Sequence, residues 1–200
     1  MHTSRARILI IVATLFAAEP AFAHHMMGGK MPQTFIQGLL SGLAHPVIGL
    51  DHLAALAAIG LLAALLRRGS LLIPLCSAAL IFGVILHVGR LTVPAAELLA
   101  ALATAAVGGL VLFRGIGVIA VTAIAAIAAV VHGYTLGESI VGAEQTPLAA
   151  YLLGLALSQA MVAACAYVWA RVLLSRGNRR LIPLAGGIVA AVGAIFALVA

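Results

Sequence analysis

Long apolar runs separated by short polar segments dominate this chain, and that pattern restricts it to one fold class. Only 8% of its 200 residues are charged and the mean hydropathy is +1.24, whereas soluble domains carry about 25% charged residues. A membrane helix needs about 20 apolar residues, so the length allows a bundle of about six. The sequence therefore predicts an all-α, polytopic membrane protein. Its expected spans are 46–66, 71–89, 95–113, 116–131, 147–174 and 181–199.

The first 23 residues have the three parts of a secretory signal peptide. Two arginines precede an apolar core over residues 8–18, and Ala-Phe-Ala at 21–23 is typical of a cleavage site. An uncleaved anchor helix is the alternative, but the apolar core is short for a membrane span. We expect a cleaved signal peptide over 1–23, with the mature N-terminus at His24 on the periplasmic side of a bacterial inner membrane.

The arginines give an independent prediction of orientation. With the mature N-terminus outside, Arg67-Arg68, Arg114 and the cluster at 176–180 all fall inside, and Arg90 alone falls outside. Arginines in short loops mark the cytoplasmic side of a membrane protein. The arginines lie in short clusters between apolar runs and form no basic face, so nucleic acid is not an expected partner.

Residues 24–45 are expected to form a periplasmic tail and a short half-helix. His24 and His25 begin a segment with three methionines, a flexible set of soft-to-borderline metal ligands. An accidental composition is the alternative. Thr34–Ala44 is apolar but short, so it is either an interfacial or re-entrant half-helix or the outer end of the first span. Residues 46–200 are then the transmembrane domain.

The motif His45-Pro46-x-x-Gly49-x-Asp51-His52 opens the first long span. Polar groups in a membrane helix cost free energy unless they are paired, hydrated or ligated, so they indicate function. Pro46 suits the first turn of a helix, where its missing N–H would be unpaired. If the helix begins there, His45 and His52 lie two turns apart on one face, with Asp51 beside them.

A second polar segment, His132-Gly133-x-x-x-Gly137-Glu138, follows the fourth span. Gly133 is expected to end that helix at a C-cap, so that His132 and Glu138 face the same outer vestibule as the first motif. For His87 the alternative is a hydrogen bond at a helix end, and for Glu97 it is pairing with the helix dipole. The predicted topology places these groups near the outer ends of their helices. The candidate metal ligands are His45, Asp51, His52, His132, Glu138, His87, Glu97, His24 and His25.

Imidazole and carboxylate groups suit nickel, cobalt, zinc, iron or copper(II), and the ligand types alone do not choose among them. Cys76 and Cys165 lie inside apolar runs and are expected to be packing residues. The small residues Gly38, Gly42, Gly60, Gly83, Gly108, Gly109 and Gly154 are expected to let helices pack closely. Three functions stay open: a metal permease, a non-transporting metal chaperone or sensor, and an intramembrane metalloenzyme. The last is disfavoured because no H-E-x-x-H helix is present, so we expect no enzyme.

At these two motifs the chain resembles the HupE/UreJ family of hydrogenase and urease accessory permeases. The resemblance implies a secondary transporter for nickel or cobalt, with the histidines and aspartate of the first motif required for transport. The second motif holds a single histidine, His132, which leaves zinc and copper as alternatives. The expected partners are the lipid bilayer and the metal ion. A homo-oligomer and a periplasmic metal donor or acceptor stay open.

Overall fold

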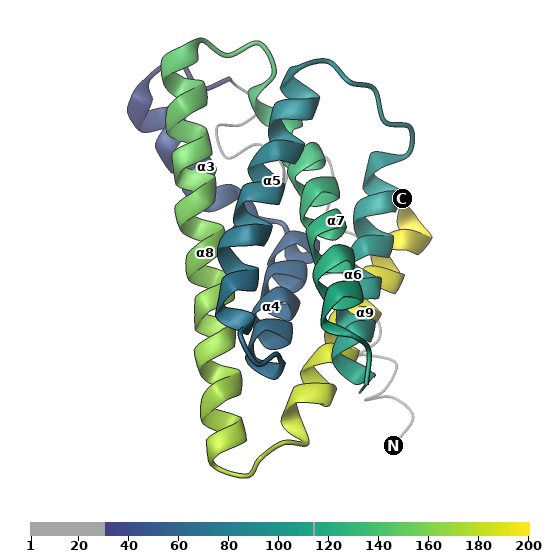
Figure 1. The fold of residues 1–200 in the computed structure, drawn as a ribbon. Coiled ribbons are helices and arrows are strands. Elements are labelled where there is room, and N and C mark those ends of the chain that lie inside the picture. Colours follow the sequence, from purple (N-terminus) through teal and green to yellow (C-terminus); the bar gives the residue numbers. More distant parts are fainter. Residues whose placement is uncertain (1–30, 114) are drawn as a thin grey trace, which may run out of the picture.

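The computed structural model describes residues 31–113 and 115–200, and its regular elements there are helices (Figure 1). The predicted signal peptide and the candidate ligands His24 and His25 lie outside this part of the chain. Short 3₁₀ turns at Gly69–Leu71 and Glu138–Ile140 precede α5 and α8. The helices are α3 (Phe35–Ile48), α4 (Leu50–Leu65), α5 (Leu72–Val88), α6 (Ala96–Leu112), α7 (Val118–Gly137), α8 (Gln145–Ser175) and α9 (Leu181–Val199).

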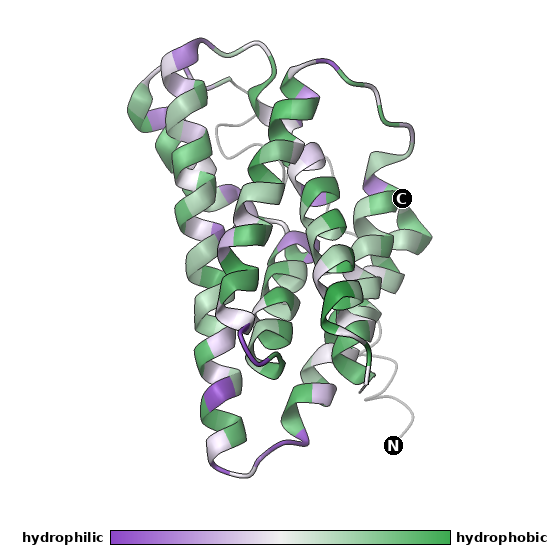
Figure 2. Cartoon of the chain, viewed as in Figure 1, coloured by the Kyte–Doolittle hydropathy of each residue, from purple (hydrophilic) through white to green (hydrophobic). Residues whose placement is uncertain are grey.

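The helices confirm a polytopic membrane fold. Four segments are long and apolar enough to cross a membrane: Gly69–Val88, which is α5 with the 3₁₀ turn before it, Val118–Ile140, which is α7 with the 3₁₀ turn after it, α8 and α9. Helices α3 and α4 form a fifth candidate that is bent by 80°. Helix α6 is apolar but, with 17 residues, is shorter than these four segments. It lies beside α7 and α9 in the bundle (Figure 1), so the expected number of about six spans is reached when α6 is counted. Apolar residues cover most of the helices (Figure 2).

The bundle has two distinct ends. The loops that carry Arg67-Arg68 and residues 176–180 lie at one end, which we call the arginine end (Figure 1). The loops 89–95 and 138–144 lie at the opposite end. The chain therefore alternates in direction from helix to helix, as the order of apolar runs predicts.

Helices α3 and α4 cross the bundle as one broken span. Gly38 of α3 lies against the backbone of Pro147, and Gly42, one turn further, lies against Tyr151. Gly60 of α4 then lies against the backbone of Ala163. These contacts advance in one direction along α8, from its start toward the arginine end. The glycines permit this close approach because any side chain would collide with the α8 backbone.

The prediction that a helix starts at Pro46 is wrong. Thr34 caps α3, its hydroxyl accepting a hydrogen bond from the Gln37 N–H at 3.2 Å, and the helix continues through Pro46 to Ile48. Pro46 lies in the last turn of α3, where it cannot donate to the carbonyl of Gly42, and the helix ends two residues later at Ile48. Gly49 is non-helical and separates α3 from α4. His45 and His52 therefore lie on different helices and not on one helix face.

The prediction that α7 ends at Gly133 is also wrong. The helix continues to Gly137, and Gly133 lies inside it against the backbone of Leu80 on α5. Gly83 of α5 lies against the α7 backbone at Val130 in the same way. Both glycines serve close helix packing, so His132 enters the interior of the bundle one turn before the helix ends.

Candidate metal centre

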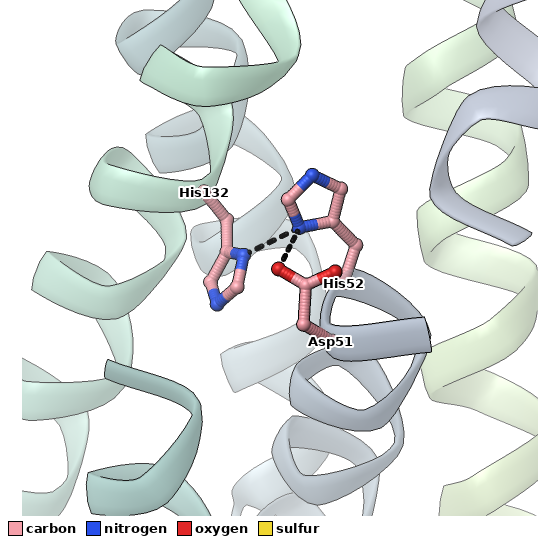
Figure 3. Close-up of side chains that lie close together, drawn as sticks. All are labelled: Asp51, His52 and His132. Carbon is pink, nitrogen blue, oxygen red and sulfur yellow. Dashed lines mark hydrogen bonds and ion pairs between the residues drawn. The ribbon is translucent and has the colours of Figure 1, made fainter. Parts of the chain in front are cut away.

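Asp51, His52 and His132 bring their side chains together at one point inside the bundle (Figure 3). The Nδ1 atom of His52 lies 2.8 Å from Nδ1 of His132 and 3.1 Å from Oδ2 of Asp51. Each residue offers one ligand atom, and these atoms all lie within 4.8 Å of one another. Two imidazoles and a carboxylate at this spacing form a candidate metal centre.

The break in the α3–α4 span positions two of the three residues. Because α4 begins immediately after Gly49, Asp51 and His52 occupy its first turn. Helix α7 supplies His132 from its last turns. All three residues are buried, with 1–4% of their surfaces exposed.

The centre lies deep in the bundle. Thr104, which contacts His132, is in the middle of α6, about 12 Å from either end of that helix. The sequence placed Asp51, His52 and His132 near the ends of their helices, and they lie in the first turn of α4 and the last turns of α7. The sequence did not predict the break at Gly49, which sets the start of α4 beside the middle of α6.

Thr104 fixes the orientation of the His132 ring. Its hydroxyl has two carbonyl acceptors, Ala100 at 3.1 Å and Asp51 at 3.4 Å, and lies 2.9 Å from Nε2 of His132. When the hydroxyl donates to either carbonyl, its oxygen accepts from Nε2–H of His132. This assignment leaves Nδ1 of His132 as the acceptor that faces His52. Histidines that bind metals usually hold their second nitrogen in such a hydrogen bond. Thr104 was not anticipated from the sequence, because a lone threonine in an alanine-rich helix carries no signal of its own.

The hydrogen-bonding pattern assigns a proton to the position where the three residues meet. In that tautomer Nδ1 of His132 accepts from Nδ1–H of His52, and Oδ2 of Asp51 lies on the same side of the His52 ring. A divalent ion bound by both Nδ1 atoms would displace this proton. A protonated His52, paired with Asp51, would release it to solvent, whereas a neutral His52 would move it to Nε2.

His45 belongs to a separate polar cluster. The Tyr151 hydroxyl donates to the Leu136 carbonyl at 2.6 Å, and its oxygen lies 3.2 Å from Nδ1 of His45. The Ser139 hydroxyl lies 3.3 Å from the same nitrogen. This cluster joins the end of α3 to the start of α8 and to the α7–α8 loop. Tyr151 and Ser139 were also not anticipated from the sequence.

The remaining candidate ligands in the described part of the chain lie apart from the centre. Nδ1 of His87 bonds to the Tyr134 backbone carbonyl at 2.7 Å, the helix-end role that was its alternative reading. Glu97 and Glu138 are exposed near the end opposite the arginines. Glu97 lies in the first turn of α6, seven residues before Thr104, so the two residues are two turns apart on one face.

A small cavity adjoins the two histidines of the centre. It has a volume of about 10 Å³, close to the least that holds one water molecule. Leu56 and Ile59 of α4 and Leu80 of α5 line it beyond His52 and His132. The cavity therefore extends from the centre into the apolar half of the bundle that lies toward the arginine end.

The broken helix and the buried His–Asp group define a polytopic membrane protein with metal ligands inside its transmembrane bundle. The HupE / UreJ protein family matches residues 12–196, nearly the whole chain, and the chain belongs to this family. Membership implies an accessory role related to nickel or cobalt transport, within a family of transporter-type membrane proteins and not of enzymes. Searches of curated proteins and of solved structures found no significant match.

Proposed function

We propose that this protein is a secondary permease for nickel or cobalt, and that Asp51, His52 and His132 bind the ion midway through the bundle. The observation that carries this proposal is the convergence of the three donors at the break of a discontinuous helix, deep in the protein. Secondary transporters commonly build their substrate sites from broken helices near the middle of the membrane.

The donor set matches the chemistry of the proposed cargo. Imidazole nitrogens are good ligands for borderline divalent ions such as Ni²⁺ and Co²⁺. The Asp51 carboxylate supplies a negative charge next to His52, and this charge offsets part of the cost of bringing a divalent cation into an apolar interior. Three protein ligands leave coordination positions for water, which a transported ion needs for exchange.

The ion would enter from the end opposite the arginines. Glu97 and Glu138 are exposed at that end, and Glu97 lies on the face of α6 that leads two turns inward to Thr104. Since arginine-rich loops remain in the cytoplasm, this entrance would face the periplasm of a bacterial inner membrane. The periplasmic tail with His24 and His25 would raise the local metal concentration there.

Metal uptake into proteoliposomes tests the proposal. Purified protein is reconstituted, and uptake of nickel, cobalt, zinc and copper(II) is measured side by side with that of the Asp51→Asn variant. We expect nickel or cobalt to enter the vesicles with the wild type and not with Asp51→Asn, which keeps the side-chain volume and removes the charge. A wild type that binds these ions but moves none would instead indicate a metal chaperone or sensor.

A further inference from the structure

Two polar side chains lie in an otherwise apolar stretch of α8. Ser158 and Gln159 are each only 1% exposed. The side-chain amide of Gln159 donates from Nε2 to the backbone carbonyl of Ser77 on α5, at 3.2 Å. Within residues 31–113 and 115–200, Oε1 of Gln159 and Oγ of Ser158 have no hydrogen-bond partner.

Burial of these two oxygens without a hydrogen bond costs folding free energy. A buried polar atom without a hydrogen bond destabilises a folded protein, and more so in a membrane, where no solvent reaches it. The hydrogen bond to Ser77 uses one of the two N–H donors of the Gln159 amide and leaves its carbonyl oxygen as an available acceptor. Available acceptors without donors nearby are suited to a cation.

The pair lies beyond the metal centre on the way to the arginine end. Gly60 of α4 contacts Ala163 of α8, and both helices run in the same direction, so Leu56 and Gln159 are at the same level one turn earlier. Leu56 also lines the cavity next to His52. Gln159 is therefore about one turn further inward than His52.

Helix α5 gives the same placement independently. Leu80 lines the cavity that adjoins His52 and His132. Ser77, whose carbonyl accepts the Gln159 amide, precedes it by three residues and is about 4.5 Å closer to the arginine end. The amide of Gln159 thus lies about one turn beyond the residues that line the cavity, toward the arginine end, and does not itself line it.

We propose that Oε1 of Gln159 is a ligand of a second, inner cation site that receives the metal ion after it leaves Asp51, His52 and His132. This inference rests on the proposed permease function. A neutral amide oxygen binds a borderline divalent ion more weakly than imidazole and carboxylate do. The ion would keep part of its water there and move on, as a transit site requires.

An equilibrium measurement tests the site without any transport. Nickel binding is titrated calorimetrically in three purified proteins: His52→Ala, His52→Ala with Gln159→Glu, and His52→Ala with Met161→Glu. A carboxylate at position 159 should bind one additional ion if this position is reached by hydrated metal. Met161 is on the same helix but 59% exposed on the outer surface, so a carboxylate there should add none. Equal binding by the two double variants would overturn the inner site.

An uptake measurement is the second test of the inner site. Gln159→Met removes both polar atoms at nearly constant volume, and we expect the maximal uptake rate to fall about tenfold, with the half-saturating concentration unchanged within about twofold. Wild-type uptake by Gln159→Met would overturn the proposal. If the wild type transports no metal but His52→Ala with Gln159→Glu still binds an additional ion, the permease function is overturned and the inner site is retained.

Discussion

His52 on α4 and His132 on α7 direct their Nδ1 atoms at each other across 2.8 Å, although 80 residues separate them in the chain. Neither polar motif of the sequence is therefore a complete site. The first motif supplies a carboxylate and one imidazole. The second motif supplies the other imidazole from α7, which packs closely against α5 at Gly83 and Gly133. Changes in either motif should thus have similar consequences.

We expect His132→Ala to impair nickel uptake as severely as His52→Ala does. Each variant removes one of the three donors, so apparent affinity should fall at least about 100-fold. The sequence alone placed His132 in an outer vestibule, where loss of its side chain would matter less. His45→Ala should be milder, because His45 contacts Tyr151 and Ser139 in the separate outer cluster. Uptake at limiting nickel, normalised to inserted protein, measures all three, and a severe His45 variant with a mild His132 variant would contradict this assignment.

Thr104→Val should lower nickel affinity without removing a ligand. Valine has nearly the shape of threonine but cannot accept the Nε2–H of His132, so the ring loses the partner that orients it. Loss of such a supporting hydrogen bond typically costs about 10–100-fold in metal affinity. Thr104→Ser keeps the hydroxyl and should retain most of the binding. Calorimetric titration of the purified variants distinguishes them, and equal affinities for valine and serine would argue against an orienting role.

Metal binding should release a proton from His52. Paired with the Asp51 carboxylate, a protonated His52 carries a proton on both ring nitrogens, and its Nδ1 lies 3.1 Å from Oδ2 of Asp51 and 2.8 Å from Nδ1 of His132. An ion bound at Nδ1 must displace the proton there, while Nε2 keeps its own. Apparent affinity should therefore weaken as pH falls, because protons compete with the ion. Titration in two buffers of different ionisation enthalpy gives the number of protons released, and we expect about one per ion at neutral pH. A buffer-independent binding enthalpy would show that His52 is neutral before the metal binds.

The sequence predicted the helices best where an apolar run ends at charged residues. The runs 71–89, 95–113 and 181–199 correspond to Leu72–Val88, Ala96–Leu112 and Leu181–Val199. The expectation that glycines mediate packing is confirmed for Gly60, Gly83, Gly108 and Gly154, which approach neighbouring helices closely, but not for Gly109, which has no neighbour within 4 Å.

The broken span could not be predicted in the same way. The chain stays apolar on both sides of Gly49, so no change of composition marks the end of α3, and Pro46 gave a plausible but incorrect start. The pairing of His52 with His132 depends on how closely α7 approaches α5 at Gly133. Such contacts between distant segments are set by tertiary packing, which the local pattern does not contain.

The orientation of the bundle is testable by labelling from outside the cell. In a background without Cys76 and Cys165, a cysteine at Glu138 should react with an impermeant reagent, and cysteines at Arg67 and Arg179 should not. The reason is that the arginine loops and the 138–144 loop lie at opposite ends of the bundle, and arginine loops face the cytoplasm. Reaction at Arg67 and Arg179 but not at Glu138 would invert the proposed entrance.

Gly49→Ala should damage the metal centre while the bundle stays folded. The backbone at Gly49 has φ −74° and ψ 110°, which any residue can adopt. A methyl group there would lie only 3.0 Å from Cδ2 and 3.3 Å from Cγ of the His52 ring. The ring would have to shift by a few tenths of an ångström, so we expect nickel affinity to fall about 10–100-fold, as when a ligand loses its orientation. Gly109→Ala is the matched control, since that position has nothing within 4 Å. Thermal unfolding of both variants should resemble that of the wild type, and a Gly49→Ala protein that binds nickel as tightly as Gly109→Ala would show that the contact at Gly49 does not position the His52 ring.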